Sequence, residues 1–175
     1  TLLGHSYGST TSGKALPMMA PGTVDNFVMF GSPGSGVRNI DAYGLPEGHV
    51  YESSIPDGDA VQGLGPDASY GTNPRKLEGI THLSGDATDA ANYWTPTPPS
   101  IAGAAGVVER AIHGFDNHMA YFEEGTRTSQ DFANIIAGAK PTTDEEWEAL
   151  KKARGNPQPS ADDESEWWKQ ALIGY

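Results

Sequence analysis

The sequence predicts an α/β fold in which a mostly parallel sheet is flanked by helices. Three observations predict it: short apolar runs bounded by glycine and proline, a strand-turn-helix pattern at the start of the chain, and amphipathic helical patterns near its end. The chain of 175 residues is long enough for one domain with a sizeable core. Its 22 glycines and 13 prolines predict a loop-rich surface between short core elements.

Three runs have the composition of buried strands. Residues 24–30 (VDNFVMF) combine β-branched and aromatic residues between turns that are rich in glycine and proline. Residues 49–55 (HVYESSI) form a second run, which is closed by a proline and an Asp-Gly-Asp turn. Residues 77–83 (LEGITHL) are a third candidate. These runs supply the sheet of the predicted fold.

Helical patterns lie between and after these runs. We expect helices over residues 9–19, 38–43 and 128–138, and a surface excursion over residues 84–106, which are rich in glycine, proline, alanine and threonine. The apolar residues of the third helix are expected to share one face: Phe132, Ile135 and Ile136.

The character of the chain changes at residue 141, so we divide it into a domain of residues 1–140 and a helical tail of residues 141–175. Two Thr-x-x-Glu capping-box spacings within residues 142–146 start a helix that ends near residue 154. A linker at 155–159 and a final helix at 160–173 follow. Apolar faces of the tail either pack on the domain or dock a partner chain; they carry Trp147, Trp167 and Trp168.

Composition narrows the classes of partner. The chain has 11 basic and 23 acidic residues and a formal net charge of −12, which repels phosphate backbones and anionic lipids, so we expect no nucleic-acid partner. No run approaches the roughly 18 apolar residues of a membrane-spanning helix, so we expect no membrane span. The absence of cysteine excludes disulfides and thiolate-bound zinc. It does not distinguish cytoplasm from exterior, so localisation stays open.

Residues 4–8 (GHSYG) match G-x-S-x-G, the nucleophile elbow of α/β-hydrolases. In this motif the serine, here Ser6, lies on a sharp turn from a strand into a helix. Gly4 and Gly8 lack a Cβ and are expected to let the strand and the helix approach closely. The backbone N–H of Tyr7, at the helix start, would stabilise a developing oxyanion. We interpret His5 as a packed structural histidine.

The acid and the base of such a site follow the nucleophile in chain order. The turn after the second strand that follows the motif offers Asp57 and Asp59, of which we favour Asp59 and keep Asp57 as the alternative. Solvated turn aspartates are the ordinary state of an Asp-Gly-Asp sequence, and only the position after that strand favours an acid here.

His118 and His113 are the candidate bases, and we favour His118, which precedes the last helix of the domain. His82 lies inside a predicted strand and is interpreted as a packed side chain. A metal site of His113, Asp116 and His118 is a third interpretation, but such spacings are common by chance. We therefore expect no metal and no organic cofactor.

With these residues identified, the sequence resembles the actinobacterial α/β-hydrolases, a family once grouped as a domain of unknown function. The resemblance covers roughly residues 1–140. Its matching pieces, in order, are Gly4-His5-Ser6-Tyr7-Gly8-Ser9, Phe30-Gly31-Ser32-Pro33-Gly34, Val50-Tyr51, Gly58-Asp59-Ala60-Val61, His118 to Phe122, Ser129, Phe132-Ala133-Asn134-Ile135 and Gly138. The family often has an Asp-Pro-Ile-like step where this chain has Asp59-Ala60-Val61, which keeps Asp57 open.

The resemblance implies a serine hydrolase whose triad is Ser6, Asp59 and His118. Such an enzyme would cleave a small-molecule acyl ester through an acyl-enzyme, as esterases and lipases of the same fold do. The alternative is a catalytically inactive hydrolase-fold subunit that acts as a binding or assembly module. A fluorophosphonate probe, which labels an activated serine, distinguishes the two.

The α/β-hydrolase sheet has strands before the elbow, and the second oxyanion donor comes from a loop after an early strand. Neither has room before Ser6 in this sequence. We therefore expect the chain to be the C-terminal half of the fold, and its partner to be the missing N-terminal half or another chain.

Overall fold

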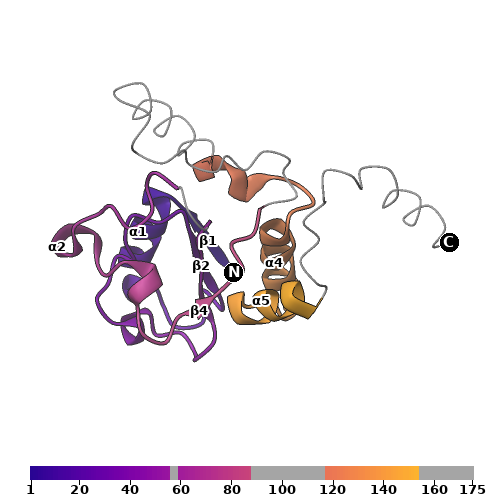
Figure 1. Cartoon of the computed structure of the whole chain (residues 1–175). Coiled ribbons are helices and arrows are strands. Elements are labelled where there is room, and N and C mark those ends of the chain that lie inside the picture. Colours follow the sequence, from indigo (N-terminus) through magenta and orange to yellow (C-terminus); the bar gives the residue numbers. More distant parts are fainter. Residues whose placement is uncertain (56–58, 88–116, 154–175) are drawn as a thin grey trace, which may run out of the picture.

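The computed structural model describes residues 1–55, 59–87 and 117–153, which form a parallel sheet with helices on both sides (Figure 1). The strands are β1 (Leu2–His5), β2 (Phe27–Phe30), β3 (Val50–Ser53) and β4 (Thr81–His82). The α-helices are α1 (Tyr7–Ala15), α2 (Asp67–Tyr70), α4 (Arg127–Ile136) and α5 (Asp144–Ala153). Short 3-10 helices are η1 (Leu16–Met18), η2 (Ile40–Tyr43), η3 (Pro74–Lys76) and η4 (Ala120–Phe122).

The four strands are parallel and lie in the order β1-β2-β3-β4, so neighbours in the sheet are also neighbours along the chain. The register sets Leu2 opposite Phe27, and Phe27 opposite Val50. β2 is buried along its whole length, because it lies between two other strands and has helices on both faces. The carboxyl ends of all four strands therefore meet at one edge of the sheet.

Alternation along β2 divides the core in two. Phe27 and Met29 face the side covered by α1, whereas Val28 and Phe30 face the side covered by α4. The buried residues on the first side are Leu16, Phe27, Met29, Tyr43, Val50, Leu77 and Ile80. Those on the second side are Val28, Phe30, Ile55, Leu83, Ala87, Tyr121, Phe132 and Ile135. Both faces of the sheet are thus covered, as the α/β fold predicted from the sequence requires.

The observed strands are shorter than the predicted runs. The run at 24–30 forms a strand only over β2, since its first residues include the polar pair Asp25 and Asn26. The run at 77–83 forms only the two residues of β4, because η3 and a turn at Gly79 with φ of +85° precede it. The turns rich in glycine and proline predicted the positions of these strands correctly but not the residues at which the strands begin and end.

The helices also differ in detail from the predictions. The helix expected over 9–19 begins earlier, at Tyr7, and becomes the 3-10 turn η1 at Leu16, where Pro17 has no N–H to donate. The segment 38–43 forms the 3-10 helix η2, whose start is capped by the Asn39 side chain. In α4 the expected apolar face is partly wrong, because Ile136 is 59% exposed while Phe132 and Ile135 are buried.

Contacts tie α5 to the rest of the described chain. The second of the two capping boxes forms, with Thr143 and Glu146 exchanging hydrogen bonds of 3.2 and 3.1 Å. The Trp147 indole N–H donates to Asp86 at 2.5 Å, and the Arg127 guanidinium lies 5.5 Å from the Trp147 ring centroid. The division at residue 141 stays a prediction. The linker at 155–159, the final helix at 160–173 and residues 88–106 of the excursion lie outside the described residues.

Among the described residues, no helix has both the length and the apolar character needed to cross a membrane.

Candidate active site

The turn between β1 and α1 holds Ser6 in an unusual backbone conformation. Its φ of 55° and ψ of −136° make it the one described non-glycine residue with positive φ. Hydrogen bonds fix the turn: the Ser6 N–H donates to the Phe30 carbonyl at 3.0 Å, and the Ser6 carbonyl accepts from the Ser9 N–H at 3.0 Å. The Ser6 side chain makes no capping hydrogen bond to α1. The Ser6 hydroxyl therefore lies at the start of α1 without capping this helix.

The two glycines of the motif have different roles. A Cβ on Gly4 would lie 2.6 Å from the Ser9 Cα, so only glycine lets β1 and α1 approach this closely. A Cβ on Gly8 would meet nothing within 4 Å, so the close approach expected at Gly8 is wrong. The reason is position: Gly8 lies in the first turn of α1, where its Cα faces open space.

Asp59 and His118 are in direct contact although 59 residues separate them. His118 Nδ1 lies 2.9 Å from Asp59 Oδ1. Both side chains are buried, with 7% of the His118 side chain and 0% of the Asp59 side chain exposed. Because an ionised carboxylate only accepts, Nδ1 is the donor, and in a neutral imidazole this leaves the lone pair on Nε2. This is the tautomer that a histidine needs to act as a general base.

Asp59 is held by several donors besides His118. Its Oδ1 also accepts from the backbone N–H groups of Val61 and Gln62, at 2.8 and 3.3 Å. Its Oδ2 accepts from the Tyr121 hydroxyl at 2.9 Å. A buried carboxylate needs such donors to stay ionised, because burial alone disfavours the charge.

Within the elbow, His5 packs against the segment that carries His118. His5 Nε2 lies 2.8 Å from the His118 carbonyl oxygen, so Nε2 donates, and the two rings lie 4.4 Å apart. The His5 ring also stacks on Phe30 at 5.1 Å. Burial lowers the pKa of His5 and keeps the ring neutral near pH 7. These contacts agree with the interpretation of His5 as a packed structural histidine.

Gly31 connects the elbow with the Asp59–His118 pair. It follows Phe30, whose carbonyl accepts from the Ser6 N–H. A Cβ on Gly31 would lie 2.9 Å from Asp59 Oδ2 and 2.9 Å from the Nδ1 and Cε1 atoms of His118. Ser6, Asp59 and His118 therefore gather at the edge where the strands end.

His82 does not fit the expectation of a packed side chain. It lies in β4 at the sheet margin, its side chain is 44% exposed, and its Nδ1 pairs with Glu52 Oε1 at 2.7 Å. The hydrogen bond that His82 donates to Glu52 raises the pKa of His82. Glu52 itself is buried, and its other carboxylate oxygen accepts from the Ser54 hydroxyl. The two-residue strand leaves His82 too near the edge to be covered.

The alternatives Asp57, His113 and Asp116 lie outside the described residues. Tyr7 opens α1, where backbone N–H groups have no partner within the helix, and its role as an oxyanion donor stays a prediction. Within the described ranges, no group of three histidine or carboxylate side chains is arranged to hold a metal ion.

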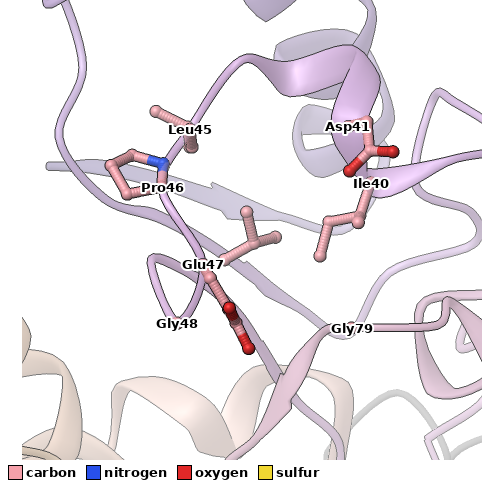
Figure 2. A pocket seen from close by; sticks show the side chains of 8 residues that line it. Ile40, Asp41, Leu45, Pro46, Glu47, Gly48 and Gly79 are labelled. Carbon is pink, nitrogen blue, oxygen red and sulfur yellow. The ribbon is translucent and has the colours of Figure 1, made fainter.

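A cavity of about 270 Å³ lies away from this edge (Figure 2). It is lined by Ile40, Asp41, Leu45, Pro46, Glu47, Gly48, Val50 and Gly79. In Figure 2 Leu45 and Pro46 lie across the hollow from Ile40 and Asp41. Val50 is the first residue of β3, so the cavity lies toward the amino end of that strand, whereas Asp59 follows its carboxyl end.

Sequence reasoning missed two residues of the site, Tyr121 and Gly31. Tyr121 belongs to the block His118 to Phe122, and its spacing of three from His118 suits a contact with the same carboxylate. Gly31 follows the apolar run of β2, a place where a parallel sheet brings site residues together.

A parallel α/β sheet with a strained serine at a strand-to-helix turn defines the α/β-hydrolase class. Residues 1–69 match a family model described as alpha/beta hydrolase. This match supports the expected α/β-hydrolase family, and the parallel sheet flanked by helices confirms the expected α/β fold class.

Three curated relatives are similar to this chain: an uncharacterized protein of Mycobacterium bovis and uncharacterized proteins of two strains of Mycobacterium tuberculosis. Each is 35% identical over 85 residues, which cover 48% of this chain and 31% of the relative. The chain thus matches about a third of the length of these proteins. Their mycobacterial origin is in keeping with the actinobacterial family named above. No solved structure gives a significant match.

Proposed function

We propose that this chain carries the nucleophile, the acid and the base of a serine hydrolase that cleaves a carboxylic ester. The observation that carries the proposal is the hydrogen bond of 2.9 Å between His118 Nδ1 and Asp59 Oδ1, at the sheet edge where the strained Ser6 also lies. The match of residues 1–69 to an alpha/beta hydrolase family supports the reaction class.

In the proposed reaction His118 Nε2 takes the Ser6 hydroxyl proton as Oγ attacks the ester carbonyl. The negative oxygen that forms faces the Tyr7 N–H, where the α1 dipole also favours negative charge. The C–O bond to the alcohol breaks, and the alcohol leaves with the proton from His118. Water, deprotonated by His118, then attacks the acyl-enzyme, and the acid product leaves as Ser6 recovers its proton.

The proposal assigns one oxyanion donor to this chain and expects the second from outside the described residues. Mutational losses of a single donor are typically about 10²- to 10³-fold in kcat, so two donors matter. We propose that the second donor, and strands that pair with the edge of β1 on which no described strand lies, come from the N-terminal half of the same fold. The relatives, of which this chain matches 31%, are long enough to hold it.

Turnover of an activated ester by the purified protein tests the proposal. p-Nitrophenyl esters of increasing acyl length release a coloured alcohol, and hydrolysis should disappear in Ser6→Ala and in His118→Ala. A Thr11→Ala variant is the matched control, since Thr11 is an exposed α1 hydroxyl that bonds only the Tyr7 carbonyl. Ester turnover that survives in Ser6→Ala would contradict the proposal. An inert protein would instead favour the alternative of a binding or assembly module.

A further inference from the structure

Tyr121 is a buried residue that contacts the acid of the candidate site, Asp59. Its side chain is 1% exposed and packs with Val28, Phe30, Ile55 and Phe132 on the α4 side of the sheet. Its hydroxyl accepts from the Ile55 N–H at 3.0 Å and donates to Asp59 Oδ2 at 2.9 Å. Ile55 and Asp59 both follow β3 along the chain, so one hydroxyl contacts two points of the segment after this strand.

The direction of these hydrogen bonds is fixed by chemistry. A hydroxyl has a single proton, and the Ile55 N–H can only donate, so the Tyr121 proton is free to point at the carboxylate. Burial raises the pKa of Tyr121, and the negative charge of Asp59 raises it further, so the hydroxyl keeps its proton. The hydrogen bonds from the Ile55 N–H to the Tyr121 hydroxyl and from this hydroxyl to Asp59 point in the same direction, so each bond strengthens the other.

The same short segment supplies both side chains that contact the acid. His118 and Tyr121 lie three residues apart around η4, and they contact different oxygens of Asp59: His118 contacts Oδ1 and Tyr121 contacts Oδ2. With Oδ2 held by Tyr121, rotation of the carboxylate would break this bond together with those that Oδ1 accepts from His118, Val61 and Gln62. Tyr121 thus supplies the contact on Oδ2 that, beside the backbone donors to Oδ1, orients Asp59 toward His118.

We propose that Tyr121 is a positioning residue of the hydrolase: its hydroxyl orients Asp59 so that Oδ1 accepts from His118. This inference rests on the proposed function for its effect on turnover, but the orientation itself is a property of the folded protein. Tyr121 touches neither the nucleophile nor the place where substrate would react, so its role is indirect.

The experiment compares Tyr121→Phe with Tyr43→Phe. Tyr43 is the matched control, because it is also a buried tyrosine whose hydroxyl donates, here to the Ser35 carbonyl at 2.5 Å, on the opposite face of the sheet. We expect Tyr121→Phe to lower kcat for ester hydrolysis about 10- to 100-fold with KM unchanged, the range for a lost hydrogen bond to a charged group. Tyr43→Phe should leave kcat unchanged. Equal kcat in wild type and Tyr121→Phe would overturn the inference, while Ser6-dependent turnover would still support the proposed function.

A second measurement keeps the inference testable without turnover, or if Tyr121→Phe fails to fold. The Nδ1 proton between His118 and Asp59 should give a downfield proton NMR signal, and fluorotyrosine at position 121 changes the acidity of the hydroxyl with little change of shape. We expect the signal to move with this replacement and to stay in place with fluorotyrosine at position 43. If the signal does not move when fluorotyrosine replaces Tyr121, the inference that Tyr121 acts on His118 through Asp59 is contradicted.

Discussion

Ser6 carries backbone strain that the surrounding turn holds in place. A non-glycine residue with positive φ and a ψ of −136° costs on the order of 1–3 kcal/mol, which the fold must offset elsewhere. The hydrogen bonds to Phe30 and Ser9, and the close packing at Gly4, supply that support. Strain of this kind gathers at functional sites, because it presents a side chain in a direction that relaxed backbone would not allow.

Replacing Asp59 tests the acid and decides between the two turn aspartates. Asp59→Asn keeps the size of the side chain but lets its amide donate toward Nδ1, which favours the wrong tautomer of His118. By analogy with the serine-protease triad, we expect kcat for the ester to fall by about 10⁴-fold. Asp57→Asn, measured by the same assay, should retain activity. The reverse pattern would make Asp57 the acid.

Gly31 offers a steric test of the same site. Gly31→Ala adds a Cβ that would lie 2.9 Å from Asp59 Oδ2 and from His118 Nδ1, so the pair must shift. A misplacement of about 1 Å can cost about 10²-fold in rate, and we expect a loss of kcat of that order. Gly44→Ala is the control. Gly44 has a φ of +65°, which is similar to that of Gly31, but a Cβ added to Gly44 would meet no atom within 4 Å. Both variants should lose stability through backbone strain, and only Gly31→Ala should lose activity.

At the scale of the elements, β3 and β4 are joined by a buried carboxylate as well as by backbone pairing. Glu52 and His82 are register partners, and the Leu83 N–H donates to the Glu52 carbonyl at 2.9 Å. α5 adds Asp144 near His82, and η3 adds Arg75, so opposite charges act on the same imidazole. The hydrogen bond to Glu52 is the largest of these effects and stabilises the protonated form.

This pairing predicts a pH-dependent stability. Because the folded pKa of His82 is raised, its stabilising contribution is full below the unfolded pKa of about 6.5 and is lost as pH rises through the folded pKa. Chemical denaturation at about pH 6 and about pH 9 should show His82→Gln destabilising the protein more at the lower pH. The difference should vanish in a Glu52→Gln background. An equal effect of His82→Gln at both pH values would show that the pair does not titrate in this way.

For the whole molecule, the sheet and the elbow could be predicted from the sequence because the patterns that indicate them lie within short stretches of the chain. Gly/Pro punctuation and apolar runs mark β2 and β3, and G-x-S-x-G needs only five adjacent residues. Chain order offered Asp57 or Asp59 as the acid and His113 or His118 as the base, and the fold brings the favoured pair, Asp59 and His118, into contact. What could not be predicted depends on long-range packing: the exposure of Ile136, the open space at Gly8, the pairing of His82 with Glu52, and the contact of Tyr121 with Asp59.

The most direct measurement of the central claim is the site of covalent labelling by a fluorophosphonate probe, read by mass spectrometry of the digested protein. The account predicts one adduct on Ser6 in the wild type, and its loss in His118→Ala, because Nε2 must take the hydroxyl proton as Oγ attacks phosphorus. An adduct on another serine, or labelling of Ser6 that persists unchanged in His118→Ala, would contradict it.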